Sequence, residues 1–187
     1  MATERLSRAF ASSRGVLAHV SREQLHGATP CRSWDVAALV NHMVGAPRLA
    51  ADVLTTGTDT GTGADDFAAG DFLSAYEETA VAAVTAFATP GALDKTVTLP
   101  FGELPAPFFM MVVATDQFTH GWDLARATGQ PTDLDPELAA QLLAMAETSL
   151  PDDFRGEDGQ APFGPKLDAP AGAPAADHLA AFLGRSV

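Results

Sequence analysis

The chain has 187 residues, of which 47% are hydrophobic and 19% charged, so it has enough apolar material for one buried core, and disorder of the whole chain is not expected. Its 24 acidic residues outnumber its 11 Lys and Arg and give a formal net charge of −13, which excludes nucleic acid and anionic membrane surfaces as expected partners. Cys31 is the single cysteine, and the sequence has neither a leader-like N-terminal segment nor an apolar run of bilayer length, so we expect a cytoplasmic protein without an internal disulfide.

Apolar residues at three- and four-residue spacing predict helices over most of the chain. The first expected helix covers residues 4–20. The second runs from Trp34 to about Leu54, with Ser33 as its N-cap and Asp35 in its first turn, where a carboxylate favours the helix dipole. A turn predicted at His26–Pro30, which contains Gly27, separates these two helices.

The middle of the chain alternates between loop and helix signals. Residues 55–66 are rich in Gly and Thr, which predicts a mobile loop that is either a plain connector or the border of a binding site. A third helix is expected over about 71–88. Residues 96–105 contain two prolines and a glycine, and we interpret them as an extended crossover, with one weak hairpin as the alternative.

The remaining elements complete a helical protein. A fourth helix is expected from Pro107 to Thr128, with its apolar first half buried at the centre. A fifth begins after Asp135, a tail over 151–174 wraps the surface, and a short helix ends before Gly184. We therefore predict one all-α domain over 1–187, a helical bundle with its core at about 4–150 and its tail at 151–187.

One polar stripe interrupts the apolar fourth helix. Asp116, His120 and Asp123 have the spacing i, i+4, i+7, which places them within about 60° of one another on one helix face. That face continues the apolar positions that point to the core. Because burial of a charge costs several kcal/mol unless it is paired or bound to a metal, this stripe needs a chemical explanation.

Two explanations are open for the stripe. Asp116 and His120 are either a simple intrahelical pair, with Asp123 as a cap or in contact with solvent, or two ligands of a metal ion, as in other carboxylate-x3-His helices. His42 in the second helix is a candidate third ligand if the two helices pack together. The alternative for His42 is a hydrogen-bonded residue at the edge of the core.

A few other residues have two interpretations each. Arg48 and Arg126 either bind an acidic substrate or lie on the surface. Cys31 is either a reactive thiol before a helix N-terminus or a small packed side chain. The other histidines are expected to be solvated or bonded locally: His19, His26 and His178.

Three stretches resemble one protein family. They are TPCRSW at 29–34, LVNHMVG at 39–45 and HGWDLARATGQ at 120–130. They resemble the actinobacterial family similar to the N-terminal domain of mycothiol-dependent maleylpyruvate isomerase, which belongs to the DinB/YfiT-like metalloenzymes. The last residues, from Pro162 to Gly184, resemble the tail of a short, uncharacterised branch of that family.

This resemblance implies a DinB-like four-helix bundle with a divalent metal, most simply Zn²⁺ or Ni²⁺. Carried over by position, its ligands are His42, Asp116 and His120, while Asp123 matches the aspartate of the motif and is expected to support the site from outside the ligand shell. The family more usually has Glu at the position of Asp116, and Asp loses about 1.5 Å of reach. A looser or water-bridged site is therefore one expectation.

The resemblance also implies a chemistry. A divalent metal with an open position stabilises a thiolate, which favours a metal-dependent thiol transferase or isomerase that uses mycothiol and a small electrophile. The alternatives are a metal-dependent hydrolase and a non-catalytic metal- or ligand-binding bundle in stress response. The oligomeric state stays open, with a homodimer among the candidates.

Overall fold

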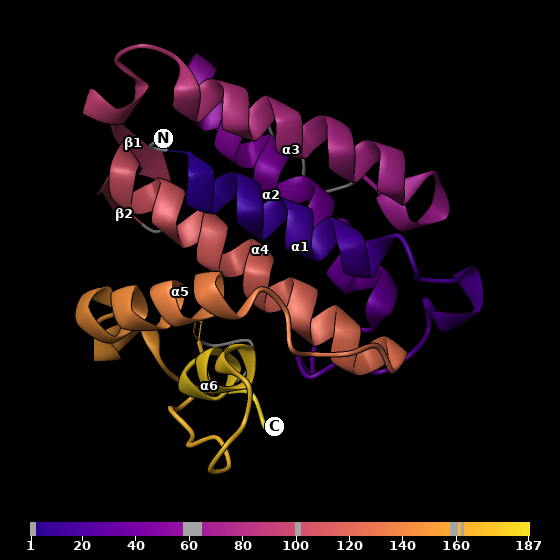
Figure 1. Cartoon of the computed structure of the whole chain (residues 1–187). Coiled ribbons are helices and arrows are strands. Elements are labelled where there is room, and N and C mark those ends of the chain that lie inside the picture. The colour runs from indigo at the N-terminus through magenta and orange to yellow at the C-terminus, as the bar shows by residue number, and fades with distance from the viewer. Residues whose placement is uncertain (1–2, 58–64, 100–101, 158–160, 162) are drawn as a thin grey trace.

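The computed structural model describes residues 3–57, 65–99, 102–157, 161 and 163–187. The described chain is mostly helical, with six α-helices and one small two-stranded sheet (Figure 1). The helices are α1 (Glu4–Leu17), α2 (Val36–Thr56), α3 (Phe72–Ala88), α4 (Ala106–Thr128), α5 (Pro136–Ser149) and α6 (Ala175–Phe182), and the strands are β1 (Thr96–Leu99) and β2 (Gly102–Pro105).

Aspartate side chains begin three of these helices. Asp35 accepts a hydrogen bond from the backbone N–H of Ala38 at 2.8 Å, so the prediction of Ser33 as the N-cap of α2 is wrong. Asp71 and Asp135 cap α3 and α5 in the same way. In each case the carboxylate satisfies a backbone donor that has no partner within the helix.

The four long helices pack side by side. α2 lies along α3, α1 lies along α4, and α2 also contacts α4 (Figure 1). Their shared core contains large side chains that are almost fully buried: Leu6, Leu39, Met43, Tyr76, Phe87, Phe118 and Trp122. The packing of α2 against α4 matters most for function, because it brings the two helices with the candidate ligands together.

The burial along α4 differs from the prediction. Its apolar first half is only partly buried, whereas every residue from Gln117 to Ala125 is buried. The second half is covered on a further side by α6, where the Trp122 indole N–H donates to Asp177 at 2.7 Å. The most apolar part of the helix is therefore not its most buried part.

Two short strands, Thr96–Leu99 and Gly102–Pro105, pair in this region, so the interpretation as an extended crossover is wrong and the hairpin alternative is right. β1 and β2 are antiparallel, with Thr96 opposite Pro105 and Leu99 opposite Gly102. Val97 and Leu99 alternate into the core, which is the pattern of a half-buried strand. The prediction of an all-α chain is corrected to a mostly helical one.

Two further segments were predicted as loops. α2 continues to Thr56, so the first residues of the expected 55–66 loop are helical, and residues 58–64 of that prediction lie outside the described residues. The chain after α5 folds back onto α6, where the Arg155 guanidinium donates to the carbonyl of Phe182 at 2.7 Å.

None of the described helices combines the length and the apolar content that a bilayer crossing requires.

Candidate metal centre

The structure brings the three predicted ligands together. His42 extends from α2 toward Asp116 and His120, which lie one turn apart on α4. The Nε2 atom of His42 lies 3.0 Å from Oδ1 of Asp116, and Nε2 of His120 lies 3.4 Å from the same oxygen. One donor atom from each residue lies within 4.8 Å of the other two.

These separations suit a tetrahedral metal ion. Ligand atoms bound to Zn²⁺ at about 2.0–2.1 Å stand about 3.3 Å apart at the corners of a tetrahedron. The two Asp116-to-imidazole distances, 3.0 and 3.4 Å, bracket that value. The shorter aspartate side chain therefore reaches both imidazoles, and the two nitrogens and one oxygen form a donor set that Zn²⁺ and Ni²⁺ accept.

Asp116 and His120 both have shifted pKa values, in opposite directions. Burial acts to raise the pKa of Asp116, but the neighbouring charges of His42 and His120 hold it well below its usual range. Burial acts to lower the pKa of His120, whereas the charge of Asp116 raises it well above its usual value. Without a metal, Asp116 therefore stays ionised beside a protonated His120, and metal binding at Nε2 of His120 has to release that proton.

Neighbouring side chains hold these groups in place. The Trp34 ring lies 4.7 Å from the His42 ring and 5.4 Å from the His120 ring, measured between centroids. The Gln117 side-chain amide donates to Oδ2 of Asp116 at 3.1 Å. Such contacts restrict ring and carboxylate rotation, which fixes the direction of each donor atom.

The segment that supplies Trp34 is itself organised by one hydroxyl. Thr29 Oγ1 lies 2.8 Å from the carbonyl of Trp34 and 2.9 Å from that of Cys31, and it accepts from the Cys31 N–H at 3.1 Å. These bonds fold residues 29–34 into a compact turn before α2. The turn brings both Trp34 and Cys31 against α4.

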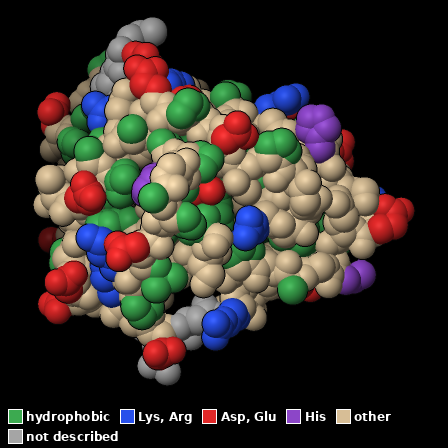
Figure 2. Space-filling model, turned by 60° about the horizontal axis from the view of Figure 1, so that its bottom comes forward, with side chains coloured by type: hydrophobic (Ala, Val, Ile, Leu, Met, Phe, Trp, Pro, Cys, Tyr) green, Lys and Arg blue, Asp and Glu red, His purple; other side chains and the backbone are tan. Residues whose placement is uncertain are grey.

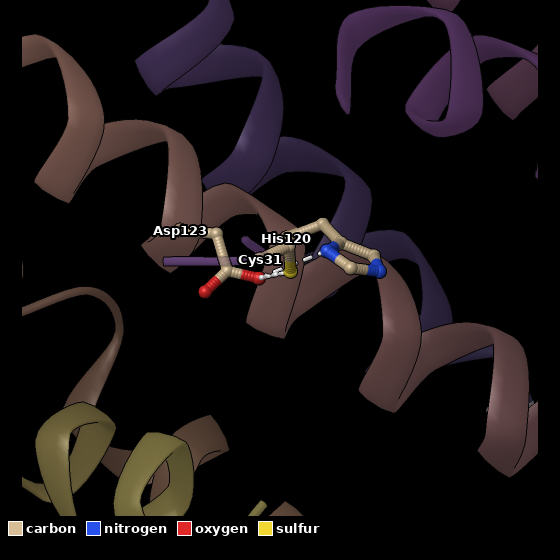
Figure 3. A group of neighbouring side chains, drawn as sticks. All are labelled: Cys31, His120 and Asp123. Carbon is tan, nitrogen blue, oxygen red and sulfur yellow. Dashed lines mark hydrogen bonds and ion pairs between the residues drawn. The ribbon is translucent and has the colours of Figure 1, made fainter. Parts of the chain in front are cut away.

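Asp123 contacts the His120 ring at Nδ1, whereas Asp116 lies near the other ring nitrogen, Nε2. It is fully buried, and its Oδ2 atom lies 2.9 Å from Nδ1 of His120 and 3.4 Å from the sulfur of Cys31 (Figure 3). Arg185, near the C-terminus, donates to both of its oxygens. Burial acts to raise the pKa of Asp123, but the guanidinium of Arg185 and the bond from His120 lower it to about 2.

Cys31, His120 and Asp123 form a second group of potential metal ligands within 4.8 Å. Figure 3 shows that the Cys31 sulfur and the His120 ring both approach the same side of Asp123. The guanidinium of Arg185 already lies against this group, 3.0 Å from Asp123 and 3.6 Å from the sulfur. It supplies the positive charge that a metal ion would bring, so this group is the poorer metal site.

A cavity of about 850 Å³ opens beside the first group. Its lining includes His42, Asp116 and His120, the turn at 29–34 and residues 183–186. This volume lies in the range of small-molecule sites. On the face that Figure 2 shows, acidic and basic side chains are interspersed with apolar ones.

The arginines at this cavity are not those that the sequence suggested. Arg48 is exposed and paired with Asp65 at 2.6 Å, and neither it nor the exposed Arg126 belongs to the described lining. The arginines that do line the cavity are Arg32 and Arg185. Arg32 lies within the TPCRSW motif, which offered a signal, whereas no local pattern marks Arg185.

The chain is similar to one described protein family and to two mycobacterial proteins. A family model described as the mycothiol maleylpyruvate isomerase N-terminal domain matches residues 6–125. Two uncharacterised proteins of Mycobacterium tuberculosis, MT0763 of strain CDC 1551 / Oshkosh and Rv0738 of strain ATCC 25618 / H37Rv, are each 41% identical to the chain over 187 residues, which is 100% of this chain and 97% of theirs. No solved structure matches the chain significantly.

Proposed function

Because this chain belongs to the mycothiol maleylpyruvate isomerase N-terminal domain family, we propose that His42, Asp116 and His120 bind one divalent metal ion, Zn²⁺ or Ni²⁺. The observation that carries the proposal is the convergence of their donor atoms, with Asp116 3.0 Å from one imidazole and 3.4 Å from the other. In this proposal α1 to α4 form a DinB-like four-helix bundle, and residues 1–187 are one cytoplasmic domain that presents the site.

We further propose that the protein is a metal-dependent thiol transferase or isomerase. A bound divalent ion supplies a positive charge that lowers the pKa of a thiol and keeps it as a thiolate. In a transfer, the thiolate sulfur forms a bond to an electrophilic carbon while the bond to the leaving group breaks and that group departs with the electron pair. In an isomerisation, addition of the thiolate breaks a carbon–carbon π bond, rotation about the resulting single bond follows, and elimination of the thiolate restores the double bond. The family name makes mycothiol the natural thiol, and the 850 Å³ cavity provides room for it.

The residues of the chain have separate tasks in this scheme. His42 and His120 contribute neutral nitrogens and Asp116 contributes one negative charge, so the occupied site keeps a net positive charge toward the cavity. Trp34 packs on both imidazoles and limits the access of water from its side. Asp123 stands behind His120 and is not among the described residues that line the cavity, whereas Cys31 lines it.

Metal content tests the first part. Protein purified without a nickel column is expected to hold one Zn²⁺ or Ni²⁺ per chain by elemental analysis, and His42→Ala and His120→Ala are expected to lose it. His19→Ala is the matched control, because His19 is exposed just after the end of α1, and the side-chain hydrogen bond that the described residues give it is a local one with the carbonyl of Gly15. A metal content that is equal in all four proteins contradicts the ligand assignment.

Turnover tests the second part. Mycothiol consumption is measured with a panel of halogenated and epoxide electrophiles, in metal-loaded wild type, His120→Ala and His19→Ala. Metal-dependent consumption that only His120→Ala loses supports the transferase or isomerase. Tight thiol binding without consumption favours a binding protein in stress response, and metal-dependent ester hydrolysis without thiol favours a hydrolase.

A further inference from the structure

The C-terminal residues form part of the candidate metal centre. Arg185 follows α6 and lies 60 residues beyond the end of the family match at Ala125. Its Nε and Nη2 atoms donate to the two oxygens of Asp123 at 3.2 and 3.0 Å. The side chain of Arg185 is 11% exposed and that of Asp123 is 0% exposed, so this two-point contact is shielded from water.

The contact bears directly on the orientation of His120. A neutral imidazole carries one N–H, and its other nitrogen has the lone pair that binds a metal. Nδ1 of His120 lies 2.9 Å from Asp123, and Nε2 lies 3.4 Å from Asp116. If Nδ1 donates to Asp123, the lone pair of Nε2 points toward Asp116 and His42.

We propose that Arg185 is a positioning residue for the metal site. Its planar guanidinium holds the plane of the Asp123 carboxylate by two parallel hydrogen bonds, and the carboxylate in turn holds the His120 ring. A carboxylate that accepts a hydrogen bond from a metal-binding histidine determines the tautomer of that histidine and the orientation of its ring. The inference rests on the proposed function, because it assumes that His120 Nε2 binds a metal.

The local backbone explains how Arg185 reaches this place. Gly184 has φ +93°, a conformation that residues with a side chain rarely adopt. A Cβ atom at Gly184 would lie 2.5 Å from the Cα of Gly164, so the two glycines allow a backbone contact that any other residue blocks. The turn at Gly184 ends α6 and directs the next side chain at α4.

Zn²⁺ affinity and the Co²⁺ spectrum test the proposal. Zn²⁺ affinity is measured by competition with a chromophoric chelator, and the visible absorption of the Co²⁺-loaded protein reports ligand geometry. Arg185→Met is expected to weaken Zn²⁺ binding by about 10- to 100-fold and to change the Co²⁺ spectrum. Arg185→Lys is expected to fall between Arg185→Met and wild type, because an ammonium group bonds a carboxylate without fixing its plane.

Arg155→Met is the matched control. Arg155 donates to the carbonyls of Phe182 and Gly164 and lies over the Phe182 ring, so it anchors the same C-terminal segment without touching Asp123. Its loss is expected to lower the melting temperature and to leave Zn²⁺ affinity and the Co²⁺ spectrum unchanged.

The outcomes separate this inference from the proposed function. If wild type binds Zn²⁺ and Arg185→Met binds it equally well with the same Co²⁺ spectrum, the positioning role is wrong and the proposed function stands. The role is also wrong if Arg155→Met weakens binding as much as Arg185→Met. If wild type binds no metal, both fall. Should Arg185→Met fail to fold, Arg185→Lys decides, and an unchanged affinity in that variant overturns the inference.

Discussion

At Gly121, α4 lies close against Ser13 of α1, and substitution with alanine tests that contact. A Cβ atom at Gly121 would overlap the Ser13 hydroxyl and lie 3.0 Å from the Cβ and 3.1 Å from the Cα of Ser13. Favourable carbon–carbon contacts lie at about 3.5–4.0 Å. Since the nearest atoms include the backbone of α1, a rotation of the serine side chain alone does not relieve the overlap.

The expected cost follows from three contributions. Overpacking of this kind costs about 1–3 kcal/mol. Displacement of the Ser13 hydroxyl also breaks its buried 2.7 Å hydrogen bond to the carbonyl of Gln117, which adds about 1 kcal/mol. The better helix propensity of alanine returns about 1 kcal/mol. Gly121→Ala is therefore expected to lower the free energy of unfolding by about 1–3 kcal/mol.

Urea unfolding by circular dichroism measures this change, with Gly15→Ala as the control. Gly15 lies within α1 and has open space around the position of a Cβ atom, so alanine there is expected to stabilise the protein by about 0.5–1 kcal/mol. Ser13→Gly combined with Gly121→Ala is expected to recover part of the loss, because the two sites are in contact. If Gly121→Ala is as stable as Gly15→Ala, the reasoning about this contact is refuted.

Two further predictions concern the effect of metal removal and the effect of pH on stability. A chelator is expected to lower the melting temperature of metal-loaded protein, because a metal at 1,000 times its Kd adds about 4 kcal/mol of stability; an unchanged melting curve contradicts a metal that joins α2 to α4. The hydrogen bonds from Arg8 lower the pKa of Asp135, so this carboxylate stabilises the fold above its unfolded pKa of about 3.9 and loses that effect as the pH falls through its folded value. Asp135→Asn is therefore expected to be less stable than wild type by up to about 1 kcal/mol near pH 7. At strongly acidic pH, urea unfolding is expected to show no difference between the two proteins. A difference in stability that does not change with pH contradicts this prediction.

Elements with strong local signals are the ones that the sequence predicted well. The helices that begin after Asp71 and Asp135 start where a side-chain cap and the apolar period agree. At α2 two residues competed, and Asp35 forms the cap because it directly precedes the first helical residue, Val36. Ser33 instead lines the cavity, and nothing in the local pattern separates these two roles.

The residues of the candidate site also divide into those that the sequence predicted and those that it did not. Asp116 and His120 were predicted because helical spacing alone places them on one face; His42 was a candidate third ligand if the two helices packed together, and the family motif supported it. Asp123 was predicted from the same spacing, but its partners come from distant segments, Cys31 at a separation of 92 positions in the sequence and Arg185 at 62. Such contacts depend on how the helices pack against one another, so the periodicity of the sequence does not predict them.

The buried pair of Asp123 and Arg185 bears on why α4 carries a polar stripe. Removing two charges from water costs several kcal/mol for each ion, and their attraction often does no more than offset it, so apolar residues of similar volume frequently stabilise a protein as well or better. Trp122 and Leu124, which flank Asp123 on α4, are fully buried, so this carboxylate lies in an apolar stretch of the core. Stability alone therefore does not account for a carboxylate at position 123. A requirement for an acceptor behind His120 does account for it, and it equally explains why the C-terminal segment delivers an arginine to this one carboxylate.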